Sequence, residues 1–304
     1  MVGSDVENVV VQSPSDAARG RYKLVAIDLD GTLLSPTGDV TPRAKAAVHK
    51  CLGAGLLVVF ATGRHWAESR AVLHAVEHFS SAVFVGGAIV MDTSRRVTLH
   101  RVAMEPMLAR ELSDLIERAG HAVLAAQDHD AAGCDYVLTS DLPATSETDN
   151  WLRKAKAEVR RVPQLATFDH RHTVRVSFVA TPEELTRVER QINDRFAERV
   201  FYHRIRVPST GLELLETFDP SVNKWEGILT VARQHDVRPE EVIAIGDDLN
   251  DLHMIEHAGL GVAMGNARDE VKALAKRVIG ANADEGLAEF LEELVETHAV
   301  EQTP

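Results

Sequence analysis

The 304-residue sequence predicts an α/β protein, with a core built on a parallel sheet and an inserted α+β domain. Three observations lead to this prediction. Short runs of purely apolar residues alternate with helical segments near both ends of the chain, as in βα units. Each run ends in polar residues or glycine, as strands do when they deliver functional groups to a sheet edge. In the middle of the chain, apolar and polar residues alternate instead, which is typical of antiparallel strands.

The first part of the chain should form three βα units of one parallel sheet. Its first helix should begin at Thr41-Pro42, because Thr is a good N-cap and Pro fits the first helical position. The apolar runs and helical periodicity predict strands at 24–27, 56–61 and 82–85 and helices at 42–52 and 66–78. The polar residues 1–21 are expected to form a flexible tail.

The pattern changes after residue 91 and returns to the α/β type near residue 211, which predicts a core domain of 22–91 and 211–304 and an inserted domain of 92–210. The inserted domain should contain strands at 97–102, 121–126, 136–138, 173–179 and 200–203 and helices at 106–119, 151–161 and 182–199, with a further strand at 212–216. The clean alternation at 173–179 predicts one face that is solvated or open, as in an antiparallel sheet. The last part should contain strands at 242–245 and 260–263 and helices at 223–234, 269–276 and 285–296.

The composition narrows the class of protein. A net charge of −13 argues against a nucleic-acid partner or an anionic membrane surface. The two cysteines, Cys51 and Cys134, lie far apart in no metal or redox spacing, which fits a reducing compartment. No apolar run is long enough to span a bilayer, and residues 1–21 lack the features of a secretory signal. We therefore expect a cytoplasmic protein; the sequence leaves the oligomeric state open.

The first strand runs directly into Asp28-Leu29-Asp30-Gly31-Thr32. Two residues of spacing place both carboxylates on one side of an extended chain, and Gly31 lets a ligand approach the main chain. A calcium loop would need a closing Glu, and a P-loop NTPase would need a Gly-x4-Gly-Lys-Ser/Thr cradle that the sequence lacks. A simple Asp/Gly turn is the structural alternative.

Other polar residues follow the remaining strands or begin helices, and the shared edge of a parallel sheet can bring them together. They are Thr62, Lys224, Asp247, Asp248, Asn250 and Asp251. Carboxylates without His or Cys are hard oxygen ligands that suit Mg²⁺. A Lys and a Thr beside them suit a phosphate substrate, whose charge they would share with the metal. For Thr62 and Asp251, a purely structural role as helix N-caps is the alternative.

The sequence resembles the haloacid dehalogenase (HAD) superfamily of phosphohydrolases, in the Cof-type branch (subfamily IIB). The resemblance covers residues 22 to about 295 and implies a Rossmann-like core with an inserted type C2 cap. It rests on four motifs in the family's order: Asp28-Leu29-Asp30-Gly31-Thr32, Ala61-Thr62-Gly63-Arg64, Lys224 at the start of its helix, and Gly246-Asp247-Asp248-Leu249-Asn250-Asp251. The chain departs from the family at Gly86-Gly87, where Cof-type proteins usually have Asn-Gly.

The resemblance implies that Asp28 is the nucleophile and that it forms an aspartyl-phosphate. Asp30 would protonate the leaving oxygen and then act as base on the attacking water. Mg²⁺ would be held by Asp28, the Asp30 carbonyl and Asp247. Phosphate would be bound by Thr62, Gly63, Lys224 and Asn250, with Gly31, Thr32, Asp248 and Asp251 in supporting roles.

The predicted function is therefore a Mg²⁺-dependent phosphatase that acts on small organic phosphates, such as sugar phosphates or cofactor-like phosphates. A sugar phosphomutase of the same superfamily is the alternative enzyme. A signalling receiver shares some of these groups but not their order, and a non-catalytic sensor of a phosphometabolite is a distant alternative. Arg175, in the inserted domain, either faces the active site or faces solvent.

Overall fold

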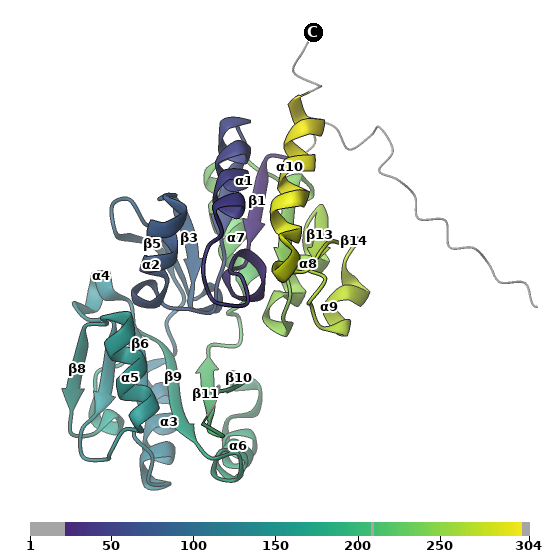
Figure 1. Cartoon of the computed structure of the whole chain (residues 1–304). Helices are drawn as coiled ribbons and strands as arrows, with labels where there is room; N and C mark the ends of the chain where they lie inside the picture. Colours follow the sequence, from purple (N-terminus) through teal and green to yellow (C-terminus); the bar gives the residue numbers. More distant parts are fainter. Residues whose placement is uncertain (1–21, 208–209, 300–304) are drawn as a thin grey trace, which may run out of the picture.

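The computed structural model describes residues 22–207 and 210–299. The chain forms two parts, each built around its own large sheet, and Figure 1 shows them one above the other. The predicted tail, 1–21, lies outside the described residues.

The core sheet is parallel throughout, in the order β14-β13-β12-β1-β2. Its strands are β1 (Leu24–Ile27), β2 (Leu57–Phe60), β12 (Val242–Gly246), β13 (Leu260–Ala263) and β14 (Arg277–Val278). Every residue of β1 and β12 is buried, as expected for apolar strands that are covered on both faces. The predicted parallel α/β core is confirmed.

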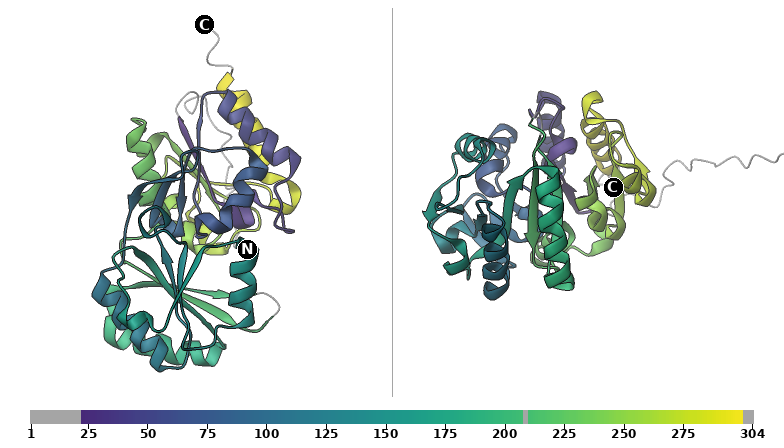
Figure 2. Two further views of the ribbon diagram at one scale, coloured as in Figure 1. Left: turned by 90° about the vertical axis from the view of Figure 1, so that its left-hand side faces the viewer. Right: turned by 90° about the horizontal axis from the view of Figure 1, so that it is seen from below.

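Helices cover both faces of this sheet. They are α1 (Pro42–Gly53), α2 (Trp66–Val76), α7 (Lys224–Gln234), α8 (Leu252–His257), α9 (Asp269–Leu274) and α10 (Gly286–Ala299). The left view of Figure 2 shows α1 and α10 side by side on one face, with α7 on the other. The start of α1 is as predicted, because the Thr41 hydroxyl accepts a hydrogen bond from the Ala44 amide.

The third predicted βα unit is wrong. Strand β3 (Ser81–Phe84) meets the core sheet through a single parallel bridge between Ala61 and Val83, and only a 3-10 turn at Val85–Gly87, not an α-helix, separates it from the next strand. It pairs instead with antiparallel β4 (Ile89–Asp92), which in turn pairs with β5 (Val97–Arg101). The chain reverses direction at Val85 and Gly86, whose φ angles are +51° and +66°.

The second sheet has six strands in the order β10-β11-β9-β6-β7-β8, and all neighbours are antiparallel except β7 and β8. These strands are β6 (Leu124–Gln127), β7 (Tyr136–Thr139), β8 (Val159–Val162), β9 (Thr173–Ala180), β10 (Phe201–Arg206) and β11 (Glu213–Phe218). Helices α3 (Pro106–Arg118) and α6 (Pro182–Phe196) contact β9 and each other. Two shorter helices, α4 (His129–Ala132) and α5 (Ser146–Ala155), complete this part. The predicted α+β insertion is confirmed as a fold.

Two local predictions in the inserted part are wrong. The helix predicted at 151–161 is α5, which begins after Thr145 and ends where Lys156 takes a left-handed conformation, so that 159–162 pairs with β7 as a strand. The predicted solvated face of 173–179 is also wrong. Arg175 is 2% exposed and Ser177 is 1% exposed, because the rest of the protein covers this face of β9.

Strand pairing suggests a different division between the two parts from the one the sequence indicated. Strand β5 pairs with β4 on the core side, whereas β11 lies between β9 and β10 in the six-stranded sheet. We propose that the inserted domain begins between β5 and α3 and ends after β11. Apolar contacts also join the two parts, since Tyr136 and Leu152 belong to the same buried cluster as β1.

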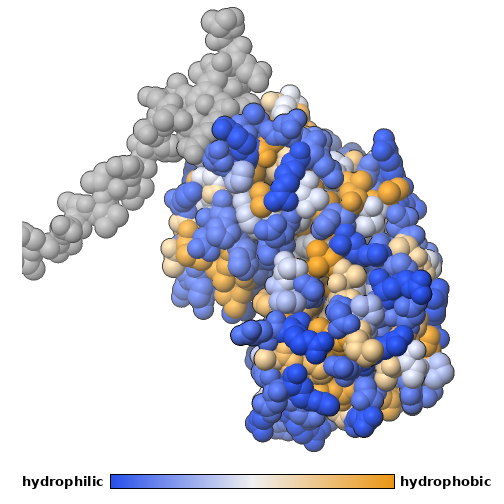
Figure 3. All heavy atoms as spheres, turned by 180° about the vertical axis from the view of Figure 1, so that it is seen from behind, coloured by the Kyte–Doolittle hydropathy of each residue, from blue (hydrophilic) through white to orange (hydrophobic). Residues whose placement is uncertain are grey.

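Among the described residues, no helix is both long and apolar enough to cross a membrane. Figure 3 shows the side opposite to that of Figure 1, where apolar surface is scattered between polar groups.

Candidate active site

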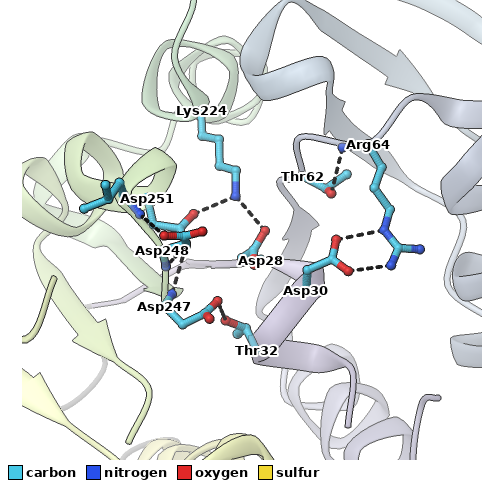
Figure 4. Close-up of polar contacts among 10 residues, drawn as sticks. Asp28, Asp30, Thr32, Thr62, Arg64, Lys224, Asp247, Asp248 and Asp251 are labelled. Atoms are coloured by element: carbon cyan, nitrogen blue, oxygen red, sulfur yellow. Dashed lines mark hydrogen bonds and ion pairs between the residues drawn. The ribbon is translucent and has the colours of Figure 1, made fainter. Parts of the chain in front are cut away.

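Asp28 stands at the carboxyl end of β1, and Asp247 stands at the carboxyl end of the neighbouring strand β12 (Figure 4). Asp251 follows in the turn after β12, and one carboxylate oxygen from each of the three residues lies within 4.8 Å of the others. Burial raises the pKa of Asp28 well above its ordinary value, Lys224 opposes this effect, and the charges of Asp251 and Asp247 add to it. The edge of the sheet therefore gathers three acids around one point.

Lys224 provides the balancing charge. It is the first residue of α7, whose N-cap Asn223 accepts a hydrogen bond from the Glu226 amide. Its Nζ, 1% exposed with the rest of the side chain, donates to Asp28 Oδ1 and to Asp251 Oδ1, each at 2.6 Å. Burial acts to lower the pKa of Lys224, but the two carboxylates outweigh it and hold the pKa above its ordinary value. Lys224 is thus an ammonium fixed between two acids.

Gly87 sets the position of the helix that carries Lys224. Its φ is +113°, and a Cβ at this position would lie 2.0 Å from the Asn223 carbonyl oxygen. The backbone of the turn after β3 therefore packs directly on the start of α7. A larger residue at position 87 would push this helix, and Lys224 with it, away from Asp28.

The Asp251 carboxylate links Lys224 to the main chain at the end of β12, and it does not cap a helix. Its Oδ2 accepts hydrogen bonds from the main-chain amides of Asp247 and Asp248, at 2.9 and 3.1 Å, while its Oδ1 is bound by Lys224. It makes no side-chain cap to α8, so the N-cap alternative for this residue is wrong. Both of its oxygens are already engaged by neighbouring groups.

The Asp247 carboxylate is held by the loop that follows β1. Thr32 Oγ1 donates to Asp247 Oδ1 at 3.2 Å, and Gly31 has a φ of +73°. A Cβ on Gly31 would lie 2.1 Å from Asp247 Oδ2, so this close approach requires glycine. Burial first, and then the charge of Asp251, raise the pKa of Asp247 to about 7.

Asn266 completes this side of the cluster and was missed from the sequence. Its Nδ2 donates to the Gly31 carbonyl at 2.8 Å and lies 3.4 Å from Asp247 Oδ2. A signal was present, because Asn266 follows β13 and so lies at the same edge of the parallel sheet as Asp28.

The corner at the end of β2 holds Thr62 and Gly63, two of the four residues predicted to bind phosphate. Thr62 is fully buried and its hydroxyl accepts from the Arg64 amide at 3.1 Å. The cap of α2 is His65, so the N-cap alternative for Thr62 is wrong. A Cβ on Gly63 would lie 3.6 Å from Asn250 Nδ2, which places Asn250 beside this corner.

Two of the predicted acids are exposed and paired with arginines. Asp30 forms a two-pronged ion pair with Arg64, in which Nε donates to Oδ2 at 2.8 Å. Asp248 pairs with Arg268 and accepts from the Leu249 amide at 2.8 Å. Arg64 lies in a predicted motif, but its pairing with Asp30 depends on how the two loops meet in space.

The inserted domain reaches this site through Arg175. Its guanidinium forms a buried ion pair with Glu216, with Nη1 2.6 Å from Oε1, and Nη1 also donates to the Gly63 carbonyl at 3.2 Å. The choice left open by the sequence is therefore decided, because Arg175 faces the site and not solvent. The contact ties the cap sheet to the loop that carries Thr62.

The charge balance of the cluster fits a bound cation. Three carboxylates face one ammonium, and burial, together with the charges of the neighbouring acids, raises the pKa values of Asp28 and Asp247. The donors are all oxygen atoms, a set that suits a hard divalent ion. The cluster thus has the composition of a metal site.

Comparison with known proteins gives a consistent result. A family model described as haloacid dehalogenase-like hydrolase matches residues 25–291. The chain is 28% identical over 279 residues to 5-amino-6-(5-phospho-D-ribitylamino)uracil phosphatase YitU of Bacillus subtilis, covering 89% of this chain and 96% of that protein. It is 27% identical over 285 residues to pyridoxal phosphate phosphatase YbhA of Escherichia coli, covering 88% of this chain and 97% of that protein.

The fold comparison agrees. A solved haloacid dehalogenase-like hydrolase from Bacteroides thetaiotaomicron superimposes with a TM-score of 0.77 at 24% identity, over 90% of this chain and 99% of that one. The match of the family model spans both parts of the chain and all four predicted motifs. The resemblance to the haloacid dehalogenase superfamily is confirmed. The chain belongs to the haloacid dehalogenase-like hydrolase family.

Proposed function

We propose that the protein is a Mg²⁺-dependent phosphatase that hydrolyses small organic phosphate monoesters through an aspartyl-phosphate on Asp28. The observation that carries this proposal is the convergence of Asp28, Lys224 and Asp247 at one buried point from three separate segments. The named activities of the two bacterial relatives, which are phosphatases of cofactor-related phosphates, support the substrate class.

Asp28 is suited to nucleophilic attack on phosphorus. Lys224 holds Asp28 Oδ1, which fixes the orientation of the carboxylate and leaves its second oxygen to form the new P–O bond. Lys224, Thr62 and the main chain near Gly63 would bind the phosphoryl oxygens as charge develops on them. The leaving alcohol departs with the electron pair of the broken P–O bond, and water later releases phosphate from Asp28.

Asp30 would donate a proton to the leaving oxygen and then take one from the attacking water. Its carboxylate is 57% exposed and paired with Arg64, so this role requires the pair to separate when substrate enters. Arg64 would thereby hold Asp30 at the mouth of the site until the ester oxygen replaces it as a partner.

The residues that would hold Mg²⁺ are Asp28, Asp247 and the main-chain carbonyl of Asp30. Asp251 is better suited to a supporting role, because Lys224 and two main-chain amides engage its oxygens. When bound, the ion would neutralise the charge that a phosphate dianion meets beside these acids. Thr32 and Asn266 keep Asp247 oriented toward the cluster.

The test is phosphate release from a panel of organic phosphates, with Mg²⁺ or with EDTA, for the wild type and for Asp28→Asn. Asp39→Asn is a matched control, because Asp39 is an exposed acid in the turn after the site and, among the described residues, its hydrogen bonds are to Thr37 and Ser35. We expect Mg²⁺-dependent release that Asp28→Asn abolishes and Asp39→Asn leaves unchanged. Release that is independent of metal, or that survives in Asp28→Asn, would overturn the proposal. Transfer of phosphate between positions of a sugar, without release, would identify a mutase instead.

A further inference from the structure

Three aromatic rings gather on the inserted domain at the edge of its sheet. Phe201 and His203 lie on β10 and Phe218 lies on β11. The ring centroids are 5.1 Å apart for Phe201 and His203, 6.2 Å for Phe201 and Phe218, and 6.3 Å for His203 and Phe218. We call these three side chains the ring cluster. Each separation is within the range of favourable aromatic contact.

Strand register places the ring cluster on the side of the sheet that faces the candidate active site. His203 lies directly opposite Glu216, and opposite residues of an antiparallel pair project to the same face. Glu216 binds Arg175 at 2.6 Å, and Arg175 donates to the Gly63 carbonyl at 3.2 Å. Phe218 is therefore on the strand next to Arg175, whose side chain contacts the proposed phosphate-binding loop, and Phe201 and His203 are on the strand after that.

The electrostatic environment of His203 agrees with this placement. Burial lowers the pKa of His203, the charges of Asp248 and Asp251 raise it, and those of Lys224 and Arg175 lower it further. Asp248, Lys224 and Asp251 belong to the core side of the candidate site, and Arg175 belongs to the inserted sheet. His203 is therefore within electrostatic range of both sides of the candidate site.

The ring cluster is incompletely covered by protein. Phe201 is 43% exposed, and Leu249, next to Asp248 on the opposite side, is 41% exposed. Farther along β10, Ile205 is 44% exposed and lines a cavity of about 230 Å³ together with Arg175, Trp151 and Leu214. Exposed rings and apolar side chains therefore extend along this face of the sheet from the proposed phosphate-binding loop. This surface leaves room for the organic part of a substrate.

We propose that the ring cluster binds a flat, ring-containing leaving group while the phosphate of the same substrate lies between Asp28 and Lys224. The preferred substrates are then phosphate esters of planar, unsaturated rings and not of open-chain alcohols. This inference rests on the proposed phosphatase function. A ring stacked on Phe201 and His203 buries apolar surface that is otherwise exposed, whereas an open-chain group gains little from the same surface.

The test compares benzyl phosphate with ethyl phosphate. Both are phosphate esters of primary alcohols, so their chemical steps are similar, and the aromatic ring is the main difference between them. The variants are Phe201→Ala, the conservative Phe201→Tyr, and Phe79→Ala as a matched control. Phe79 is 39% exposed, packs on His74 at 5.0 Å and lies on the core after α2. Thermal unfolding of each variant checks that the fold is intact.

We expect the wild type to prefer benzyl phosphate, and Phe201→Ala to lower kcat/KM for benzyl phosphate about tenfold, the upper end for the loss of one ring contact. The loss should appear as a higher KM with little change in kcat, because the ring contact is the same in the ground state and the transition state. Ethyl phosphate should be hydrolysed equally by both enzymes. Phe201→Tyr should restore the preference, and Phe79→Ala should resemble the wild type.

Equal hydrolysis of the two esters by the wild type, or an equal loss for both esters in Phe201→Ala, would overturn the inference. These results differ from a failure of the phosphatase proposal. In that case neither ester, nor any other member of the substrate panel, would release phosphate in a reaction that depends on Asp28.

Discussion

Replacing Lys224 with methionine should cost about 3–5 kcal/mol of folding free energy at pH 8 and should abolish phosphate release. Methionine has a similar length, so packing is largely kept while the ammonium is lost. The change leaves Asp28 and Asp251, both buried and each 2.6 Å from Nζ in the wild type, without their shared cation. Breaking a buried ion pair from one side is expensive because the remaining charges stay desolvated.

The pH dependence follows from the sign of the carboxyl shifts. The pKa of Asp28 is already raised by burial, although Lys224 opposes this effect, and removing Lys224 raises it further. In the unfolded chain, the pKa of an aspartate is about 3.9. A group whose pKa is higher in the folded state contributes stability at low pH that is lost as the pH rises through the folded value. The destabilisation by Lys224→Met should therefore be smaller at pH 5.5 than at pH 8.

The assay is urea unfolding at both pH values, followed by circular dichroism. Lys276→Met is a matched control, because within the described part of the chain the Lys276 Nζ donates to the carbonyls of Ala258 and Gly259. This substitution should cost about 1 kcal/mol or less. Adding Asp251→Asn to Lys224→Met should recover part of the lost stability, since one of the two unpaired charges is removed. A loss below about 1 kcal/mol, or one that is equal at both pH values, would refute the reasoning.

Three further predictions concern the same region. Gly31→Ala should reduce phosphate release at least about fivefold, as expected of roughly 1–3 kcal/mol of backbone strain, because its Cβ would meet the Asp247 carboxylate at 2.1 Å. Unchanged turnover would contradict the observed close approach. Mg²⁺ should raise the melting temperature more at pH 8 than at pH 5.5. The pKa of Asp247 is raised to about 7, so above that pH the carboxylate is ionised, the stability that the raised pKa contributes is lost, and a bound cation replaces it. An equal rise at both pH values would count against Asp247 as a ligand. Arg175→Met should lower the free energy of unfolding in urea by about 3–5 kcal/mol, because it leaves Glu216 buried and unpaired. Adding Glu216→Gln to Arg175→Met should recover part of this loss. If no stability is recovered, the ion pair is not the source of the loss.

Much of the candidate site could be predicted from the sequence, because its residues lie at the ends of short apolar strands. A buried parallel strand identifies itself by its composition, and its carboxyl end has a fixed place at the sheet edge. This reasoning was sufficient to predict that Asp28, Asp247 and Lys224 meet, although nearly 200 residues separate Asp28 from Lys224. The same reasoning would have found Asn266, which also follows a core strand.

What the sequence by itself determined was the position of most core strands and their parallel sheet, the presence of an inserted α+β domain and the acids and lysine at the sheet edge. Only the tertiary structure decided which surfaces cover one another. The alternation in β9 indicates a polar face but not that Arg175 is buried there against Gly63. Likewise, nothing local in the chain shows that Arg64 pairs with Asp30 or that His203 lies opposite Glu216, the residue that binds Arg175. Periodicity reports how each segment divides into an apolar and a polar side, whereas the partner of each side is set by long-range packing between segments distant in sequence.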